Sequence, residues 1–167
     1  MKKKYLIGLA VLVSSFILVF LKDSVSASAQ ENNVEPNTES LVIYDRYGEE
    51  VELSPSPGIS VLGTQIPTSI KKLKHGESYQ SNEFSGSGTR YSGYAFQIEG
   101  IDHATLTFKK GGFAFSMYNY VTGEDMGWAN LPLDKSPYTI VGVKQKRFYF
   151  IVDNPNKGQT YNVRAGS

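Results

Sequence analysis

The chain has 167 residues, a net charge of +1 and no cysteine, which excludes disulfides, thiol catalysis, thiolate metal sites and a lipid-modified N-terminal cysteine. The near-neutral charge argues against a nucleic-acid-binding protein, because such a protein needs clustered cations to displace counterions from phosphates. The length is sufficient for one domain that is stabilised by its core alone.

The first 29 residues are typical of a cleavable secretory signal peptide. Three lysines precede an apolar run over Tyr5–Leu21, and small residues then lead to Ala27 and Ala29. These alanines match the A-x-A pattern of signal peptidase sites, which predicts cleavage before Gln30 and a secreted, extracellular protein. The alternative is an uncleaved membrane anchor, because a run of about 17 apolar residues reaches the lower limit for spanning a bilayer. In either case the domain lies outside the cytoplasm.

Cleavage changes the charge of the protein. Residues 1–29 carry four lysines and one aspartate, a net +3, so the total of +1 leaves about −2 on the 138 residues that follow. This part of the chain has no polybasic patch for a membrane surface, so we expect a membrane partner only if the signal stays uncleaved. An exported protein without disulfides does not exploit an oxidising compartment. Such proteins are typical of Gram-positive bacteria, so we expect this origin, and we expect that the secreted protein can associate with the cell wall.

The chain beyond the signal begins with a polar leader and a hairpin. Residues 30–40 (QENNVEPNTES) have no apolar period, which predicts a disordered leader before a single β domain over residues 41–167. Alternating runs at residues 41–44 and 50–53 flank a glycine-containing turn, which is a hairpin signal. The prolines of the next segment stop pairing because they lack an amide hydrogen. The hairpin either joins the main sandwich or packs against it as a lid.

Period-two alternation of aromatic and β-branched residues dominates the rest of the chain. The predicted inward faces are Tyr94, Phe96 and Ile98; Ala104, Leu106 and Phe108; Phe113, Phe115 and Met117; and Phe148, Phe150 and Val152. Further strands are expected over residues 138–143 and 160–164. Sixteen glycines and seven prolines separate these short runs, and helical spacing is absent after the signal. The pattern predicts an all-β, antiparallel β-sandwich, jelly-roll-like, with about eight to ten strands.

Part of this pattern carries a family resemblance. The segments concerned are 76–79 (GESY), 94–100 (YAFQIEG), 104–108 (ATLTF), 113–119 (FAFSMYN), 148–154 (FYFIVDN) and 161–164 (YNVR). Over residues 76–165 their order resembles the pre-peptidase C-terminal domain, a secreted jelly-roll sandwich appended to many bacterial peptidases. The resemblance implies a jelly-roll core that follows the hairpin at 41–53. The acidic N-terminal cluster with which some relatives bind calcium is missing here, and the resemblance names no partner.

The titratable residues give no recognisable catalytic set. His75 lies in a cationic stretch and His103 follows Asp102 in a predicted turn, and the chain has no G-x-S-x-G context and no zinc-binding spacing. The segment at 85–90 is typical of a mobile loop, and the segment at 153–158 is typical of a connection between two strands. We therefore expect no cofactor and no metal.

Paired carboxylates would be needed for glycoside hydrolysis, one as the acid and one as the base or nucleophile. The candidates are Glu49, Glu50 and Glu52 on the hairpin, and Glu124 with Asp125 before Trp128. Neighbouring acids are common in solvated turns, so an enzyme with an unrecognised site is the least favoured hypothesis.

The aromatic content is the main indication of function. Eleven tyrosines, nine phenylalanines and one tryptophan exceed what a small core needs, and tyrosine tolerates half-exposure. If the faces above point inward, the rings left for outward faces or loops are those of Trp128, Tyr91, Tyr118, Tyr120 and Tyr149. Such rings stack on sugars or anchor protein partners, although the same residue types are ordinary strand formers.

The leading hypothesis is therefore a secreted, non-enzymatic protein that binds cell-wall or extracellular polysaccharide. The alternative is a secreted protein-binding factor, such as an inhibitor or a matrix component.

Overall fold

The computed structural model describes residues 40–58, 65–86 and 88–167. The predicted signal segment, its cleavage residues Ala27, Ala29 and Gln30, and the leader as far as residue 39 lie outside the described residues. Within the described ranges, no helix has the length and apolarity that crossing a membrane requires. The one helical element among them is a 3-10 turn, η1 (Leu133–Lys135).

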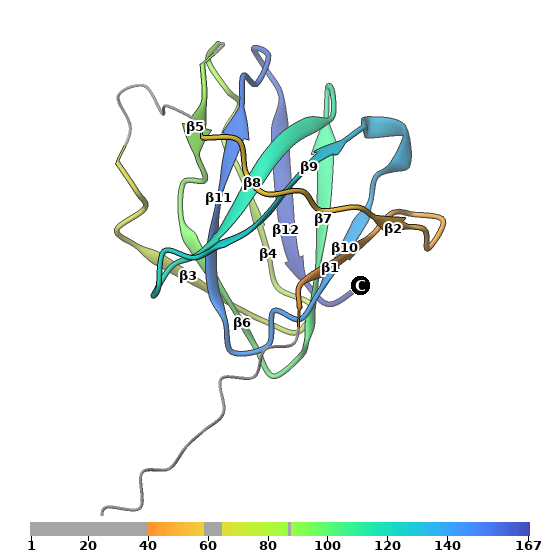
Figure 1. Ribbon diagram of the computed structural model, residues 1–167, viewed down its shortest axis with the longest axis vertical. Helices are drawn as coiled ribbons and strands as arrows, with labels where there is room; N and C mark the ends of the chain where they lie inside the picture. The colour runs from red at the N-terminus through yellow and green to blue at the C-terminus, as the bar shows by residue number, and fades with distance from the viewer. Residues whose placement is uncertain (1–39, 59–64, 87) are drawn as a thin grey trace, which may run out of the picture. The chain divides into compact units, whose positions relative to one another are not determined.

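The described residues form two sheets (Figure 1). Sheet A has the order β2-β1-β10-β7-β12-β4, and sheet B has the order β3-β6-β11-β8-β9, with β5 also paired to β11. The strands are β1 (Val42–Tyr44), β2 (Glu50–Val51), β3 (Ile70–Lys74), β4 (Ser78–Gln80), β5 (Arg90–Tyr91), β6 (Ala95–Glu99), β7 (His103–Lys109), β8 (Phe113–Asn119), β9 (Asp125–Leu131), β10 (Tyr138–Val141), β11 (Arg147–Asp153) and β12 (Thr160–Ala165).

The strands from β4 to β12 follow the order of a jelly roll. With β5 and β6 counted as one interrupted strand, the chain visits the sheets in the order A, B, A, B, B, A, B, A. The two resulting layers, β4-β12-β7-β10 and β6-β11-β8-β9, are antiparallel throughout, as two interlocked Greek keys require. The predicted all-β, jelly-roll-like sandwich is confirmed. Two details differ: β3 runs parallel to β6, and the described residues contain twelve strands instead of eight to ten.

The N-terminal hairpin belongs to sheet A. Strand β1 pairs with β2 on one side and with β10 on the other, so that Ile43 lies opposite Ile140. Both side chains are buried in the main core. The hairpin therefore extends the sheet by two strands and is not a lid, which the sequence pattern alone left open.

The predicted alternation places the core between the sheets. All four inward faces expected from the sequence contribute to one cluster, in which Tyr94 is partly buried and the other residues are buried. Phe150 at its centre stacks on Phe96 within sheet B, with 5.8 Å between the ring centroids. Its edge-to-face contact with Tyr161 at 4.8 Å crosses to sheet A. Aromatic contacts of this kind join the two layers.

Candidate functional site

The outer face of sheet B carries all five of the rings that the sequence assigned to outward positions. On β11, the side chains of Phe148, Phe150 and Val152 are buried in the core. Because successive strand residues point to opposite faces, Tyr149 and Ile151 point away from the core. They form a second apolar cluster with Ala95, separate from the core.

Four tyrosines meet on this face, with Tyr149 at the centre. The ring of Tyr118 stacks on that of Tyr149 at 5.4 Å and 17°, and the ring of Tyr91 lies 5.8 Å away on the other side. Tyr120 completes the group with a perpendicular ring at 6.4 Å. We call Tyr91, Tyr118, Tyr120 and Tyr149 the tyrosine cluster.

Strand register explains why residues so far apart in the chain meet here. Tyr149 is the direct cross-strand partner of Tyr118, and Ile151 is the partner of Tyr91. Tyr120 follows the end of β8, where its amide donates to the carbonyl oxygen of Arg147 at 2.8 Å. Cross-strand neighbours lie about 5 Å apart, which brings flat rings into contact.

A local irregularity at Ser92 holds Tyr91 in this position. Between β5 and β6 the amide of Ser92 donates to the carbonyl of Phe150, and the Ser92 hydroxyl accepts from the Phe150 amide. The same hydroxyl donates to the carbonyl of Tyr94. A serine side chain thus substitutes for a missing backbone acceptor, so β11 keeps its pairing while the neighbouring strand is interrupted.

The four rings differ in exposure. Tyr149 is only 6% exposed, while the other three are partly exposed. Burial, followed by the neighbouring Tyr91 and Tyr118, raises the pKa of Tyr149 above its ordinary value. Tyr149 therefore points outward, as expected, but forms the covered base of the cluster. The rings that a ligand can reach are those of Tyr91, Tyr118 and Tyr120.

Trp128 lies on the same outer face of sheet B but outside the tyrosine cluster. It pairs with Ser116 on β8, and on its other side its amide and carbonyl are hydrogen-bonded to Ser54. The segment around Ser54 is further fixed because Ser56 donates through its amide and its hydroxyl to the Asp125 carboxylate, at 2.7 and 2.6 Å. Trp128 thus occupies a strand edge that the chain itself covers.

A pocket of about 180 Å³ opens beside the tyrosine cluster. Tyr91 lines it and so belongs to both features. The other walls are aromatic and polar, and they are formed by Tyr79, Ser81, Asn82, Glu83, Phe84, Arg90, Gly93 and Tyr161. Sequence reasoning missed this pocket because Tyr161 has the pattern of a core residue. The one signal in the sequence that could have indicated the pocket is the polar segment at residues 81–83 next to Phe84.

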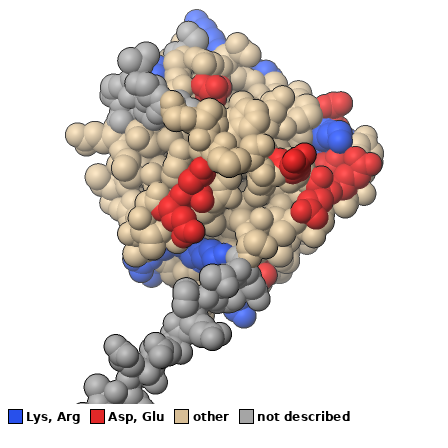
Figure 2. Space-filling model, viewed as in Figure 1, with Lys and Arg blue, Asp and Glu red and all other residues tan. Residues whose placement is uncertain are grey.

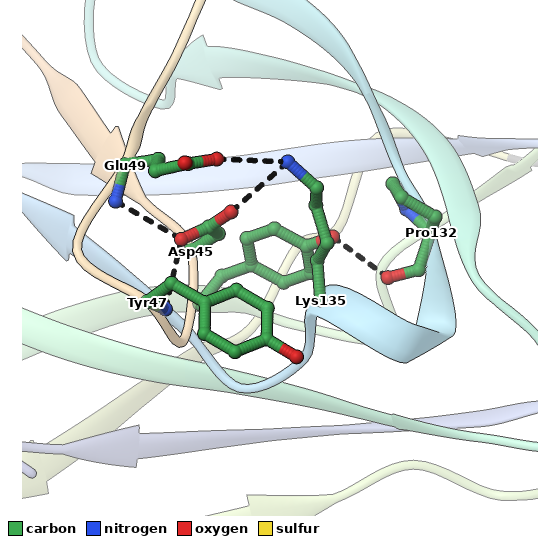
Figure 3. Close-up of polar contacts among 6 residues, drawn as sticks. Asp45, Tyr47, Glu49, Pro132 and Lys135 are labelled. Carbon is green, nitrogen blue, oxygen red and sulfur yellow. Dashed lines mark hydrogen bonds and ion pairs between the residues drawn. The ribbon is translucent and has the colours of Figure 1, made fainter.

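One of the glutamates singled out in the hairpin, Glu49, takes part in a different feature, an ion-paired carboxylate (Figure 3). The Asp45 side chain is buried, and it accepts hydrogen bonds from the amides of Tyr47 and Glu49 at 2.9 and 3.0 Å. Its second oxygen lies 3.2 Å from the Lys135 ammonium, which also reaches Glu49 at 3.2 Å. A cavity of about 310 Å³ beside this group is lined in part by Glu50 and Tyr138.

These contacts lower the pKa of Asp45 below its ordinary value. Burial alone raises it, but the amides of Glu49 and Tyr47 and the Lys135 ammonium outweigh that effect. A carboxyl with a lower pKa in the folded state stabilises the fold above the unfolded-state pKa, and this contribution disappears as the pH falls through the folded-state value. Asp45 together with Lys135 therefore fastens the hairpin turn to η1 at neutral pH.

We expect Asp45→Asn to weaken the acid sensitivity of the fold. Asparagine does not titrate, so the unfolding free energy of the variant should fall less between pH 5 and about 2 than that of the unchanged protein. Urea unfolding at a series of pH values measures this slope. Asp134→Asn, a change of an exposed neighbouring acid, serves as the control. Equal slopes for Asp45→Asn and the unchanged protein would contradict the assignment.

The remaining sequence candidates do not assemble into a site. His75 is exposed and packs against Gly166, while His103 is partly buried at the start of β7. The residues after Asp153 connect β11 to β12. Among the described residues, no group of three or more histidine, aspartate or glutamate side chains is arranged to hold a metal ion.

In comparisons with known proteins, no family model, curated protein or solved structure matches this chain.

Proposed function

We propose that this protein is a secreted, non-enzymatic binding protein that holds a cell-wall or extracellular polysaccharide through the tyrosine cluster. The observation that carries this proposal is the meeting of four tyrosines from three strand regions on one outward face, with three rings partly exposed. The predicted signal peptide accounts for the extracellular site of action.

The chemistry of the cluster suits a sugar better than a purely apolar ligand. A tyrosine ring offers a flat apolar face to the C–H groups of a pyranose, while its hydroxyl can bond to a sugar hydroxyl. Tyr91 also lines the neighbouring pocket, where Asn82 and Glu83 supply further polar groups. Binding sites of this kind combine aromatic walls with a few polar groups that fix orientation.

Two carboxyls with a shifted pKa, Asp45 and Asp125, do not offer the acid that hydrolysis needs. A glycosidase needs one carboxyl with a raised pKa that stays protonated as the acid. Asp45 and Asp125 have the opposite property. Although burial raises the pKa of Asp125, hydrogen bonds from Ser56 and from the Gly127 amide outweigh it, so the pKa lies below its ordinary value. Each of the two acids is also occupied by contacts within the protein.

Retention on insoluble glycans tests the proposal. We expect the full chain to be retained on purified peptidoglycan or another extracellular polysaccharide, and Tyr118→Ala to weaken retention by up to about tenfold, because one stacked ring is worth about 0.5–1.5 kcal/mol. Trp128→Ala should have a smaller effect, since Trp128 lies outside the cluster. The matched control is Tyr47→Ala, which removes an exposed tyrosine from the hairpin turn.

Two outcomes would contradict the proposal. Retention that is equally weakened by Tyr118→Ala and by Tyr47→Ala would show that the cluster is not the binding surface. Absence of retention on every glycan, together with a secreted protein that co-purifies with the unchanged chain but not with Tyr118→Ala, would support the protein-binding alternative, since tyrosine and arginine in one patch are also typical of protein interfaces.

A further inference from the structure

We infer that the ligand of the tyrosine cluster is an acidic polysaccharide whose sugar rings carry carboxylate groups. This inference rests on the proposed function and names the chemical class of the ligand. It comes from a row of polar and cationic side chains that runs beside the tyrosines on the outer face of sheet B.

Strand register defines the row. Lys72 on β3 pairs with Gln97 on β6, and Gln97 pairs with Arg147 on β11. We call these three residues the cationic row. Lys72, Gln97 and Arg147 lie two positions along their strands from Ile70, Ala95 and Tyr149, respectively. Residues two apart on a strand share a face and lie about 7 Å apart. The cationic row and the tyrosine cluster are therefore neighbouring rows of one surface.

The polar groups of the row are partly pre-arranged. Arg147 is exposed, and its Nε donates to the Gln97 side-chain oxygen at 3.1 Å. This hydrogen bond fixes the guanidinium. Its two terminal nitrogens have no partner among the residues that the structure describes, so they can bind a carboxylate in a bidentate manner. Lys72 is 63% exposed and lies 3.6 Å from Glu99, a loose surface contact that a ligand carboxylate can replace.

Further lysines surround the same end of the sheet. Lys71 and Lys74 on β3 are exposed, and Lys144 is exposed where its segment pairs with Ile98. Figure 2 shows Lys and Arg side chains along the lower edge of the view, where Figure 1 places β3 and β6. Acidic side chains lie toward the right, where Figure 1 places the β1–β2 hairpin, and also in a second patch on the left of the view, above the basic groups.

The two rows together match one kind of ligand. In a uronic acid the carboxylate projects from the rim of the pyranose ring. A ring that stacks on Tyr118 or Tyr91 therefore directs its carboxylate sideways, toward a neighbouring row. A neutral glucan would stack on the tyrosine rings but bring no carboxylate to the Arg147 guanidinium. A charged polymer without sugar rings would pair with the guanidinium but leave the tyrosine rings without a stacking partner.

Three soluble polymers distinguish these cases in titrations of the full chain: alginate, which has sugar rings and carboxylates; laminarin, which has rings and no charge; and polyglutamate, which has carboxylates and no sugar. We expect alginate to bind at least about tenfold more tightly than either of the others, since a charge-assisted bidentate contact adds to stacking. Binding of alginate should weaken as salt rises from 50 to 300 mM.

Variants at the row complete the test. Arg147→Gln should weaken alginate binding about tenfold, while Arg147→Lys, which keeps the charge, should recover part of that loss. Circular dichroism verifies that each variant is folded. The matched control, Arg164→Gln, removes an exposed arginine from β12 in sheet A and should leave alginate binding unchanged.

The outcomes separate this inference from the proposed function. Laminarin that binds as tightly as alginate, with Arg147→Gln unaffected, would overturn the acidic ligand and leave polysaccharide binding intact. Polyglutamate that binds as tightly as alginate, with Tyr118→Ala unaffected, would overturn both, because charge alone would then account for binding. Binding of none of the three polymers would overturn the acidic ligand.

Discussion

Replacing Phe150 with alanine is expected to lower the free energy of unfolding by about 3–5 kcal/mol, the range for deleting a buried phenylalanine ring. Phe150 is 3% exposed and touches three aromatic rings. It stacks on Phe96, meets Phe115 edge to face at 6.0 Å and contacts Tyr161 of the opposite sheet. The alanine would therefore leave a cavity between the layers and remove a contact that joins them.

Urea or thermal unfolding of the full chain measures this loss. Phe150→Leu provides the matched control, because leucine keeps much of the volume but none of the ring contacts. We expect it to cost distinctly less than alanine. A loss below about 1 kcal/mol for Phe150→Ala would show that the two sheets can close around the missing ring, and it would contradict a central role for this side chain.

Replacing Gly112 with alanine is expected to destabilise the fold by about 3 kcal/mol, toward the upper end of the range for overpacking. A Cβ atom at this position would lie 2.2 Å from the Leu131 carbonyl oxygen and 2.7 Å from the Pro132 Cα. Both neighbours are backbone atoms at the end of β9, so a side-chain rotation cannot relieve the clash. The start of β8 must therefore move away from its partner strand.

Gly86→Ala is the matched control for Gly112→Ala. An added Cβ at Gly86 has no atom within 4 Å, so the change should alter stability by no more than about 0.5 kcal/mol. Thermal melts of the two variants side by side give the comparison. Similar melting temperatures for both would contradict the tight approach of β8 to the end of β9.

The sequence predicted the strands whose side chains alternate strongly, and it missed those whose role depends on their neighbours. The inward faces that include Phe96 and Phe150 follow from period two alone. Strand β3 was missed because an edge strand can expose lysines on both faces, as Lys71 and Lys72 do. Strand β9 begins with an acid and contains Gly127, which obscures its alternation.

For the candidate site, the sequence predicted outward rings but not their assembly. That Tyr118 and Tyr149 point away from the core follows from alternation, because each directly follows a core residue of its strand. That they stack on each other depends on the register of β8 against β11, which the chain sets only when both sheets form. The same reason separates Trp128 from the cluster, since its edge is covered by Ser54, a residue 74 positions away in the sequence.

The position of the last two strands affects the order of folding. Strands β11 and β12 come latest in the chain, yet each lies in the interior of its sheet with neighbours on both sides. Without these two segments, sheet B would consist of the separate pairs β3–β6 and β8–β9, and β4 would have no partner in sheet A. The sandwich core thus closes only when the last two strands join pairs that are already available, which implies slow, cooperative folding.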